Sequence, residues 1–184
     1  LLNVGRIISR GIKLESNWSE ERLGEFYIYK NPSNLDRAFL VNQTKRADSE
    51  SEELKMITEG EFDPANTAIM PKNFPEEINS SSPSSLQVIR YYPGDIILRS
   101  EFEGNPKLLF LSESYYPGWR GFIDGLEQRI YRANYAFLGM KVLSGDHKIE
   151  FRFEPIGFHI GLWTEIVSYL FLLGVGIRRI ILKR

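Results

Sequence analysis

The segment HKIEFRFEP shows the clearest alternation of apolar and polar residues in the chain. Its apolar residues Ile149, Phe151 and Phe153 occupy every second position, and Glu150 and Arg152 stand between them. Successive side chains of a β-strand point to opposite faces of the sheet. The pattern therefore predicts a strand whose apolar residues are buried and whose charged residues point to the opposite face.

Further short runs of this kind follow one another through the second half of the chain. They are SLQVIR, DIILRSEFEG, KLLFLSES, RGFID, LEQRIYR and YAFLGMKVL. Turn-forming residues separate the runs at short spacing, as at Pro93-Gly94 and Asp124-Gly125. Closely spaced short strands with such turns are typical of an antiparallel sandwich. We therefore predict a mainly β fold, with an antiparallel β-sandwich of the immunoglobulin or jelly-roll kind over residues 86–157.

One short helix is predicted in the first half of the chain, among strands at GEFYIYK, RAFLVNQ and FDPANTAIM. Ser49 and Glu52 have the spacing of a capping box, in which both side chains pair with backbone N–H groups at the start of a helix. Leu54 and Ile57 share one face of this helix, and Gly60 is suited to end it. This half is expected to be a mixed α/β part.

A long apolar segment, IGLWTEIVSYLFLLGVGI, follows the predicted sandwich and contains one charged residue, Glu165. A bilayer core of about 30 Å requires about 20 mostly apolar helical residues. We therefore predict a transmembrane helix over residues 158–184. The alternative is a long buried helix of a soluble protein. Gly161, Glu165 and Ser168 form a small or polar stripe on the helix, which favours packing against other membrane helices.

The charges beside this segment predict its orientation. Arg178, Arg179, Lys183 and Arg184 follow it. Basic residues gather on the cytoplasmic side of membrane helices, so the C-terminus is expected to be cytoplasmic.

The predicted domains follow from this orientation. A β-rich domain at residues 1–157 is expected outside the bacterial cytoplasmic membrane. It comprises the mixed part at 1–70, an exposed Pro- and Ser-rich loop at 71–85 and the sandwich part at 86–157.

Composition removes several classes of function. The chain has 184 residues, a net charge of −1 and no cysteine, so nucleic-acid binding, disulfides, zinc–thiolate sites and thiol catalysis are not expected. His147 and His159 have no carboxylate cluster at ligand spacing, so no metal is predicted. No phosphate-binding loop or nucleophile elbow is present, and no cofactor or catalytic residue is predicted. Leu1 does not begin a signal peptide, and we expect a longer polypeptide to precede it.

The motif SYYPGWRGFIDG, residues 114–125, is echoed upstream by RYYPGD. Pro followed by Gly fits the two central positions of a type II turn, because Pro sets φ and Gly accepts the positive φ that follows. Asp-Gly between two short runs is typical of a two-residue hairpin. The predicted structural turn residues are Pro117, Gly118, Asp124 and Gly125.

The same motif supplies the candidate contact residues of the chain. They are Tyr115, Tyr116, Trp119 and Arg120. Three large aromatic residues so close together either pack at the edge of a core or form an exposed stacking platform for a sugar. We predict that Trp119 and at least one of the two tyrosines pack inward or towards the membrane-domain interface. Arg120 is interpreted as a solvated strand residue, with binding of a phosphate as the rival hypothesis.

Three segments, YYPGWRGFIDG, IYRANYAF and SGDHKIEFRFEP, precede the apolar segment and resemble the C-terminal part of the YfhO family of bacterial membrane proteins. FYIYKNPSNLDRAFLV and FDPANTAIM resemble the family further upstream. Leu138 follows NYAF where the family often has Arg, so any ligand contact of that Arg is absent here.

The resemblance implies a function for the longer protein. Family members resemble multi-spanning glycosyltransferases of the GT-C type, which use polyprenyl-phosphate sugars outside the cytoplasmic membrane. The presumed catalytic carboxylates lie in early external loops, which this chain does not contain. The chain is thus expected to be an accessory domain and last membrane helix of a protein that transfers lipid-linked sugars to cell-envelope polymers. The alternative is a membrane-anchored structural or carbohydrate-binding module without transferase activity.

The resemblance also implies the partners of the chain. They are the lipid bilayer, the remaining membrane helices of the parent protein, and a polyprenyl-phosphate sugar or a cell-wall glycan.

Overall fold

The computed structural model describes residues 5–13, 18–59 and 62–181. The strands are β1 (Arg6–Arg10), β2 (Ser19–Leu23), β3 (Phe26–Lys30), β4 (Ala38–Val41), β5 (Gln43–Ala47), β6 (Thr67–Pro71), β7 (Ser84–Tyr92), β8 (Asp95–Phe102), β9 (Lys107–Ser114), β10 (Trp119–Ile123), β11 (Leu126–Gln128), β12 (Tyr131–Ala133), β13 (Phe137–Val142) and β14 (Gly145–Phe153). The helices are α1 (Glu50–Thr58) and α2 (Ile156–Ile181).

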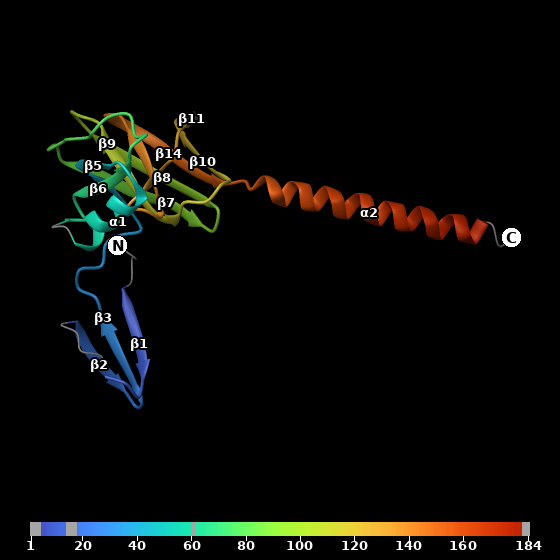
Figure 1. Cartoon of the computed structure of the whole chain (residues 1–184), viewed down its shortest axis with the longest axis horizontal. Helices are drawn as coiled ribbons and strands as arrows, with labels where there is room; N and C mark the ends of the chain where they lie inside the picture. The colour runs from blue at the N-terminus through green and yellow to red at the C-terminus, as the bar shows by residue number, and fades with distance from the viewer. Residues whose placement is uncertain (1–4, 14–17, 60–61, 182–184) are drawn as a thin grey trace.

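Two antiparallel sheets form the main body (Figure 1). A five-stranded sheet, in the order β11-β10-β14-β8-β7, packs against a four-stranded sheet, in the order β12-β13-β9-β4. The prediction of a mainly β, antiparallel fold is confirmed. Ile149 and Phe151 of β14 lie fully buried between the sheets, while Phe153 is half-buried at the end of the strand. The alternation of apolar and polar residues in this segment thus identified the core-facing side chains correctly, except for Phe153 at the edge of the core.

A third layer covers the outer face of the four-stranded sheet. It contains the parallel pair of β5 and β6, helix α1 and the segment that follows β6. Strand β9 is therefore buried on both faces: Leu109 and Leu111 enter the core between the two sheets, and Leu108 and Phe110 enter the core under this layer. This double burial explains why KLLFL is a continuous apolar run and does not alternate.

Most residues of the predicted exposed loop at 71–85 are exposed, but two of its apolar side chains are buried in this layer and its last two residues begin β7. Phe74 and Ile78 are 1% and 4% exposed and belong to the second core. Phe74 contacts the ring of Tyr131 edge-on at a centroid distance of 4.9 Å. The segment is rich in Pro and Ser, but two apolar side chains anchor it to the sheet.

Helix α1 begins as predicted and packs differently. The Ser49 hydroxyl accepts a hydrogen bond from the Glu52 backbone N–H, and the Glu52 carboxylate accepts one from the Asp48 N–H. The buried side chain of the helix is Glu53, whereas Leu54 is 40% exposed. Leu54 and Ile57 lie on the same face of α1, as predicted, but Ile57 is only half-buried and Leu54 does not enter the core. Gly60 lies outside the described residues.

The three-stranded N-terminal sheet and the C-terminal helix lie away from the main body (Figure 1). At the N-terminal end, β1, β3 and β2 form a separate antiparallel sheet in that order. At the C-terminal end, helix α2 points away from the sandwich (Figure 1). Within the residues that the structure describes, no helix combines the length and the apolar content needed to cross a membrane. The predicted transmembrane helix over residues 158–184 is therefore not supported.

Candidate functional site

The two Tyr-Tyr-Pro-Gly turns lie on either side of the end of β14. The carbonyl oxygen of Gly94 accepts a hydrogen bond of 2.9 Å from the Phe153 N–H, and that of Gly118 accepts one of 2.7 Å from the Glu154 N–H. Strands β8 and β10, which begin after these turns, are the two neighbours of β14 in the sheet. The repeated motif thus holds the last residues of the sandwich, directly before helix α2.

Side chains of the second turn tighten this junction. Trp119 is half-buried against the core and lies 5.2 Å from the Phe153 ring, measured between centroids, while Tyr116 lies 6.3 Å from the same ring and is 63% exposed. Gly118 has a φ of +118°, and a Cβ added there would lie 2.9 Å from the Cα of Pro155. Only glycine fits this contact without displacing the segment that leads into α2.

Arg120 is already paired at the same junction. Its guanidinium donates two hydrogen bonds, of 2.9 and 2.8 Å, to the Glu127 carboxylate and one of 3.0 Å to Glu154. These carboxylates raise the pKa of Arg120 further above its ordinary value. A guanidinium held by two carboxylates is a poor phosphate ligand, because both neutralise its charge. Arg120 therefore connects the β10–β11 hairpin to the residues that follow β14.

The Asp-Gly hairpin is held by a second polar contact. Asp124 and Gly125 both have positive φ, 51° and 81°. The Asp124 carboxylate accepts a hydrogen bond of 2.9 Å from the Lys148 N–H and lies 2.6 Å from Nδ1 of His147. This contact lowers the pKa of Asp124 and raises the pKa of His147. Asp124 is therefore used as a turn residue.

Tyr115, the first aromatic residue of the motif, faces a different feature, a pocket of about 550 Å³. We name it the tyrosine–arginine pocket. Strands β6, β9 and β12 and the turns next to them provide its walls. The lining residues are Pro71, Asn73, Ser114, Tyr115, Arg129, Ile130, Tyr131, Arg132, Tyr135 and Ala136.

A buried carboxylate supports one wall of this pocket. Glu53 of α1 is 1% exposed, and it accepts hydrogen bonds of 3.0 Å from Arg132 and 2.7 Å from the Tyr135 N–H. Arg132 also donates a hydrogen bond of 2.6 Å to Glu50. Burial raises the pKa of Glu53, although the two hydrogen bonds act in the opposite direction. Glu53 thus connects helix α1 to the β12–β13 turn. This contact explains why the buried side chain of the helix is a charged one.

The turn that Glu53 holds is strained. Asn134 and Tyr135 have φ values of +46° and +71°, in the left-handed region. This region costs most residues other than glycine about 1–2 kcal/mol, but asparagine tolerates it, so the strain lies mainly at Tyr135. The buried Asn134 exchanges two hydrogen bonds with Ile69, through its backbone N–H and its side-chain oxygen, at 2.8 and 2.7 Å. These contacts keep Tyr135 at the pocket, where its side chain is 40% exposed.

The two arginines of the pocket differ in charge compensation. Arg132 lies over the Tyr135 ring at 5.3 Å and is paired with two glutamates. Arg129 lies over the Tyr131 ring at 4.9 Å and has no ion pair with a carboxylate among the described residues. Arg129 is therefore the pocket's uncompensated positive charge.

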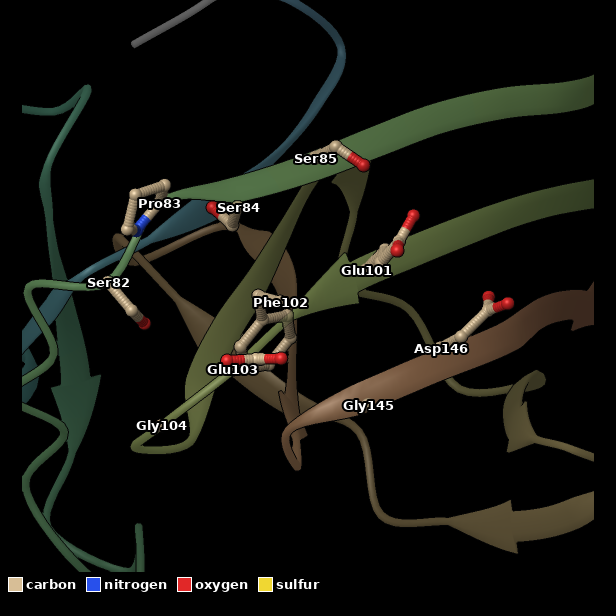
Figure 2. A pocket seen from close by; sticks show the side chains of 10 residues that line it. All are labelled: Ser82, Pro83, Ser84, Ser85, Glu101, Phe102, Glu103, Gly104, Gly145 and Asp146. Carbon is tan, nitrogen blue, oxygen red and sulfur yellow. The ribbon is translucent and has the colours of Figure 1, made fainter.

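A larger hollow, of about 830 Å³, lies at another part of the sandwich (Figure 2). Ser85, Glu101 and Asp146 are register neighbours on β7, β8 and β14 and lie in a row along it (Figure 2). Asp146 is paired with Arg99. Within the described part of the chain, no group of three His, Cys, Asp or Glu side chains is placed to hold a metal ion.

Comparison with known sequences assigns the family. The family described as "Bacterial membrane protein YfhO" matches residues 22–164. The chain belongs to the YfhO family. The YfhO protein of Bacillus subtilis (strain 168), described as uncharacterized, is 39% identical over 62 residues. That match covers 34% of this chain and only 7% of the relative's own length. No solved structure matches the chain.

Sequence reasoning found one side of the site and missed the other. Tyr115 was a predicted contact and lines the pocket, whereas Tyr116, Trp119 and Arg120 lie at the junction. Tyr131, Arg132 and Tyr135 also line the pocket, and the sequence marks them only as part of the family motif IYRANYAF. Asn between two short apolar runs is a signal for positive φ, and it could have identified this turn.

Proposed function

We propose that this chain is the C-terminal extracytoplasmic accessory region of a YfhO-like multi-spanning membrane protein that takes part in lipid-linked glycosyl transfer to cell-envelope polymers. Family membership supports the membrane context. The observation that carries the proposal is the clamped junction between the sandwich and an apolar helix. Such a junction suits a domain whose position relative to the membrane is fixed.

Helix α2 requires an apolar environment. Leu170, Phe171 and Leu172 are 59%, 69% and 67% exposed, and consecutive residues are about 100° apart around a helix axis. The apolar surface therefore surrounds the helix and does not form a single stripe. A helix that is apolar all round is stable when lipid or other helices cover it. We propose that α2 lies in the bilayer against the other membrane helices of the parent protein.

The basic residues 178, 179, 183 and 184 give the proposed orientation, with the C-terminus in the cytoplasm and residues 1–157 outside. In this arrangement the sandwich stands where polyprenyl-phosphate sugars and envelope polymers meet. The chain supplies no catalytic carboxylate in this proposal. It shapes the mouth of the active site or binds the acceptor, and the chemistry occurs in the parent protein.

The test is a transfer assay with the parent protein in membrane vesicles. Passage of a radiolabelled sugar from a polyprenyl-phosphate donor to the envelope polymer is measured for two alanine variants. Gly118→Ala disturbs the junction, whereas Gly125→Ala places the same substitution at another positive-φ glycine with open space around its Cβ. We expect Gly118→Ala to lose most transfer and Gly125→Ala to retain it. Equal transfer by both variants contradicts the accessory role, and no transfer by the intact parent contradicts glycosyl transfer.

The tyrosine–arginine pocket favours a second candidate function, a membrane-anchored carbohydrate-binding module without transferase activity. Half-exposed tyrosines in a pocket suit sugar binding whether or not transfer follows. The two candidates differ in the same assay. A parent protein that transfers no sugar, together with a chain that still binds glycan, supports the second.

A further inference from the structure

We propose that the tyrosine–arginine pocket binds a pyranose sugar that carries a phosphate group. This inference deepens the proposed function by naming a binding site and a ligand class. It rests on that function for its biological role, but the binding itself can be measured independently.

The aromatic residues of the pocket suit the sugar ring. Tyr115 and Tyr135 are 45% and 40% exposed, and Tyr131, which is half-buried, also lines the pocket. Among the described residues, the hydroxyls of Tyr115 and Tyr135 have no hydrogen-bond partner. A pyranose has an apolar C–H face and hydroxyls around its edge. Tyrosine rings can therefore cover the face while their hydroxyls bind the edge.

The volume and the polar groups also fit a small ligand. Ligand pockets commonly measure about 300–1,000 Å³ and combine apolar walls with a few polar groups. The cavity of about 550 Å³ has Pro71, Ile130 and Ala136 as apolar walls. Asn73 and Ser114 provide hydrogen-bonding groups at its surface. This composition differs from the larger hollow, which lacks tyrosine and arginine.

The arginine of the pocket that has no carboxylate partner suits an anionic substituent. Arg132 is neutralised by Glu50 and Glu53, whereas Arg129 has no carboxylate partner in the described part of the chain. The Arg129 guanidinium is held over the Tyr131 ring and keeps its hydrogen-bond donors available. Guanidinium groups bind phosphate through paired hydrogen bonds. Arg129 is therefore the residue that we assign to the phosphate.

The backbone of the pocket is preorganised at an energetic cost. The left-handed pair Asn134 and Tyr135 is held from one side by Glu53 and from the other by Ile69. Backbone strain that the surrounding structure enforces occurs often at ligand sites. Here the strained turn fixes a tyrosine at the pocket before any ligand binds, which lowers the entropy cost of binding.

The pocket is also close to the proposed membrane. Tyr115 lines the pocket, and the next residue, Tyr116, contacts Phe153 at the junction with α2. A ligand in the pocket is therefore near the point where the apolar helix begins. A sugar attached to a membrane lipid through phosphate can reach this place, and so can the free sugar phosphate.

The test measures binding to the full 184-residue chain in detergent micelles by isothermal titration calorimetry. The soluble probes are glucose 1-phosphate, N-acetylglucosamine 1-phosphate, the two neutral sugars and inorganic phosphate. We expect both sugar phosphates to bind more tightly than either the neutral sugar or phosphate alone. Liposomes with the polyprenyl-phosphate form of each sugar distinguish the two sources. Stronger binding to these liposomes assigns the ligand to the lipid, and equal binding assigns it to the free sugar phosphate.

Variants connect the binding to the pocket. We expect Arg129→Gln to weaken binding of the sugar phosphate at least about tenfold, as for loss of a charge-assisted hydrogen bond, and to leave neutral-sugar binding within about twofold. Tyr115→Ala should weaken binding of both the sugar phosphate and the neutral sugar. Arg90→Gln, on strand β7, is the matched control and should change neither. Circular dichroism melts of each variant show that loss of binding does not reflect unfolding.

Three results overturn the inference. They are no binding of any sugar phosphate in solution or on liposomes, unchanged binding after Arg129→Gln and Tyr115→Ala, and phosphate alone binding as tightly as the sugar phosphates. Failure of the transfer assay with intact sugar binding overturns the proposed function and leaves the pocket assignment in place.

Discussion

Substitution of Glu53 by alanine tests the polar support under the tyrosine–arginine pocket. The change removes the acceptor of two hydrogen bonds, from Arg132 and from the Tyr135 backbone N–H. Breaking a buried ion pair costs about 3–5 kcal/mol, since the remaining charge is left uncompensated. Because the Arg132 side chain is 24% exposed and keeps its contact with Glu50, we expect the lower end, about 3 kcal/mol.

Glu50→Ala is the matched control for this substitution. It removes the other carboxylate of the same arginine, but the Glu50 side chain is 67% exposed. Exposed ion pairs contribute about 0–1 kcal/mol. Glu53→Gln should fall between the two variants, because the amide oxygen can still accept from the Tyr135 N–H.

The assay is urea denaturation of the full chain in detergent, followed by circular dichroism and by tryptophan fluorescence. The difference in midpoint between variants, at equal slope, gives the difference in unfolding free energy. Equal destabilisation by Glu50→Ala and Glu53→Ala would refute the reasoning. It would mean that Glu53 does not hold the strained turn and that its buried contact contributes no more to the unfolding free energy than the exposed contact of Glu50.

Three further predictions concern the junction and the hairpin. Trp119→Ala should lower the unfolding free energy by about 2 kcal/mol, roughly half the cost for a fully buried aromatic residue, and Tyr116→Ala should cost less; equal urea midpoints would contradict this packing. Thermal melts should show that Gly118→Ala is less stable than Gly125→Ala, because only the alanine at position 118 places its Cβ against Pro155. The opposite order of melting temperatures would contradict this contact. Because the pKa of His147 is raised, its pairing with the ionised Asp124 stabilises the fold fully just below pH 6.5 and is lost as pH rises through the raised pKa. Urea midpoints measured over this pH range should show the loss of stability, and the His147→Gln variant should not show it.

Local patterns in the sequence predicted much of the sandwich. The alternation in HKIEFRFEP identified the two buried residues Ile149 and Phe151, and Ser49 correctly indicated the start of α1. These features depend on residues close together in the chain. Hydrophobic period and capping chemistry are local, so a single sequence contains them.

The pocket could not be predicted in the same way, because its parts come from distant segments. Glu53 and Arg132 are 79 positions apart, and Asn134 and Ile69 are 65 apart. A glutamate on a short helix is expected to be exposed, and only the tertiary contact with Arg132 and Tyr135 explains its burial. The burial of Phe74 and Ile78 could not be predicted for the same reason, since they are isolated apolar residues in a polar segment.

The side of the membrane on which the sandwich stands is the most direct test of the account. The chain has no cysteine, so a single cysteine can be introduced at a chosen position and labelled there. In intact cells that express the parent protein without other accessible cysteines, an impermeant maleimide should label Glu103→Cys and should label Lys183→Cys only after permeabilisation. Labelling of Lys183→Cys alone in intact cells would contradict the orientation, and labelling of both would contradict the placement of α2 across the bilayer.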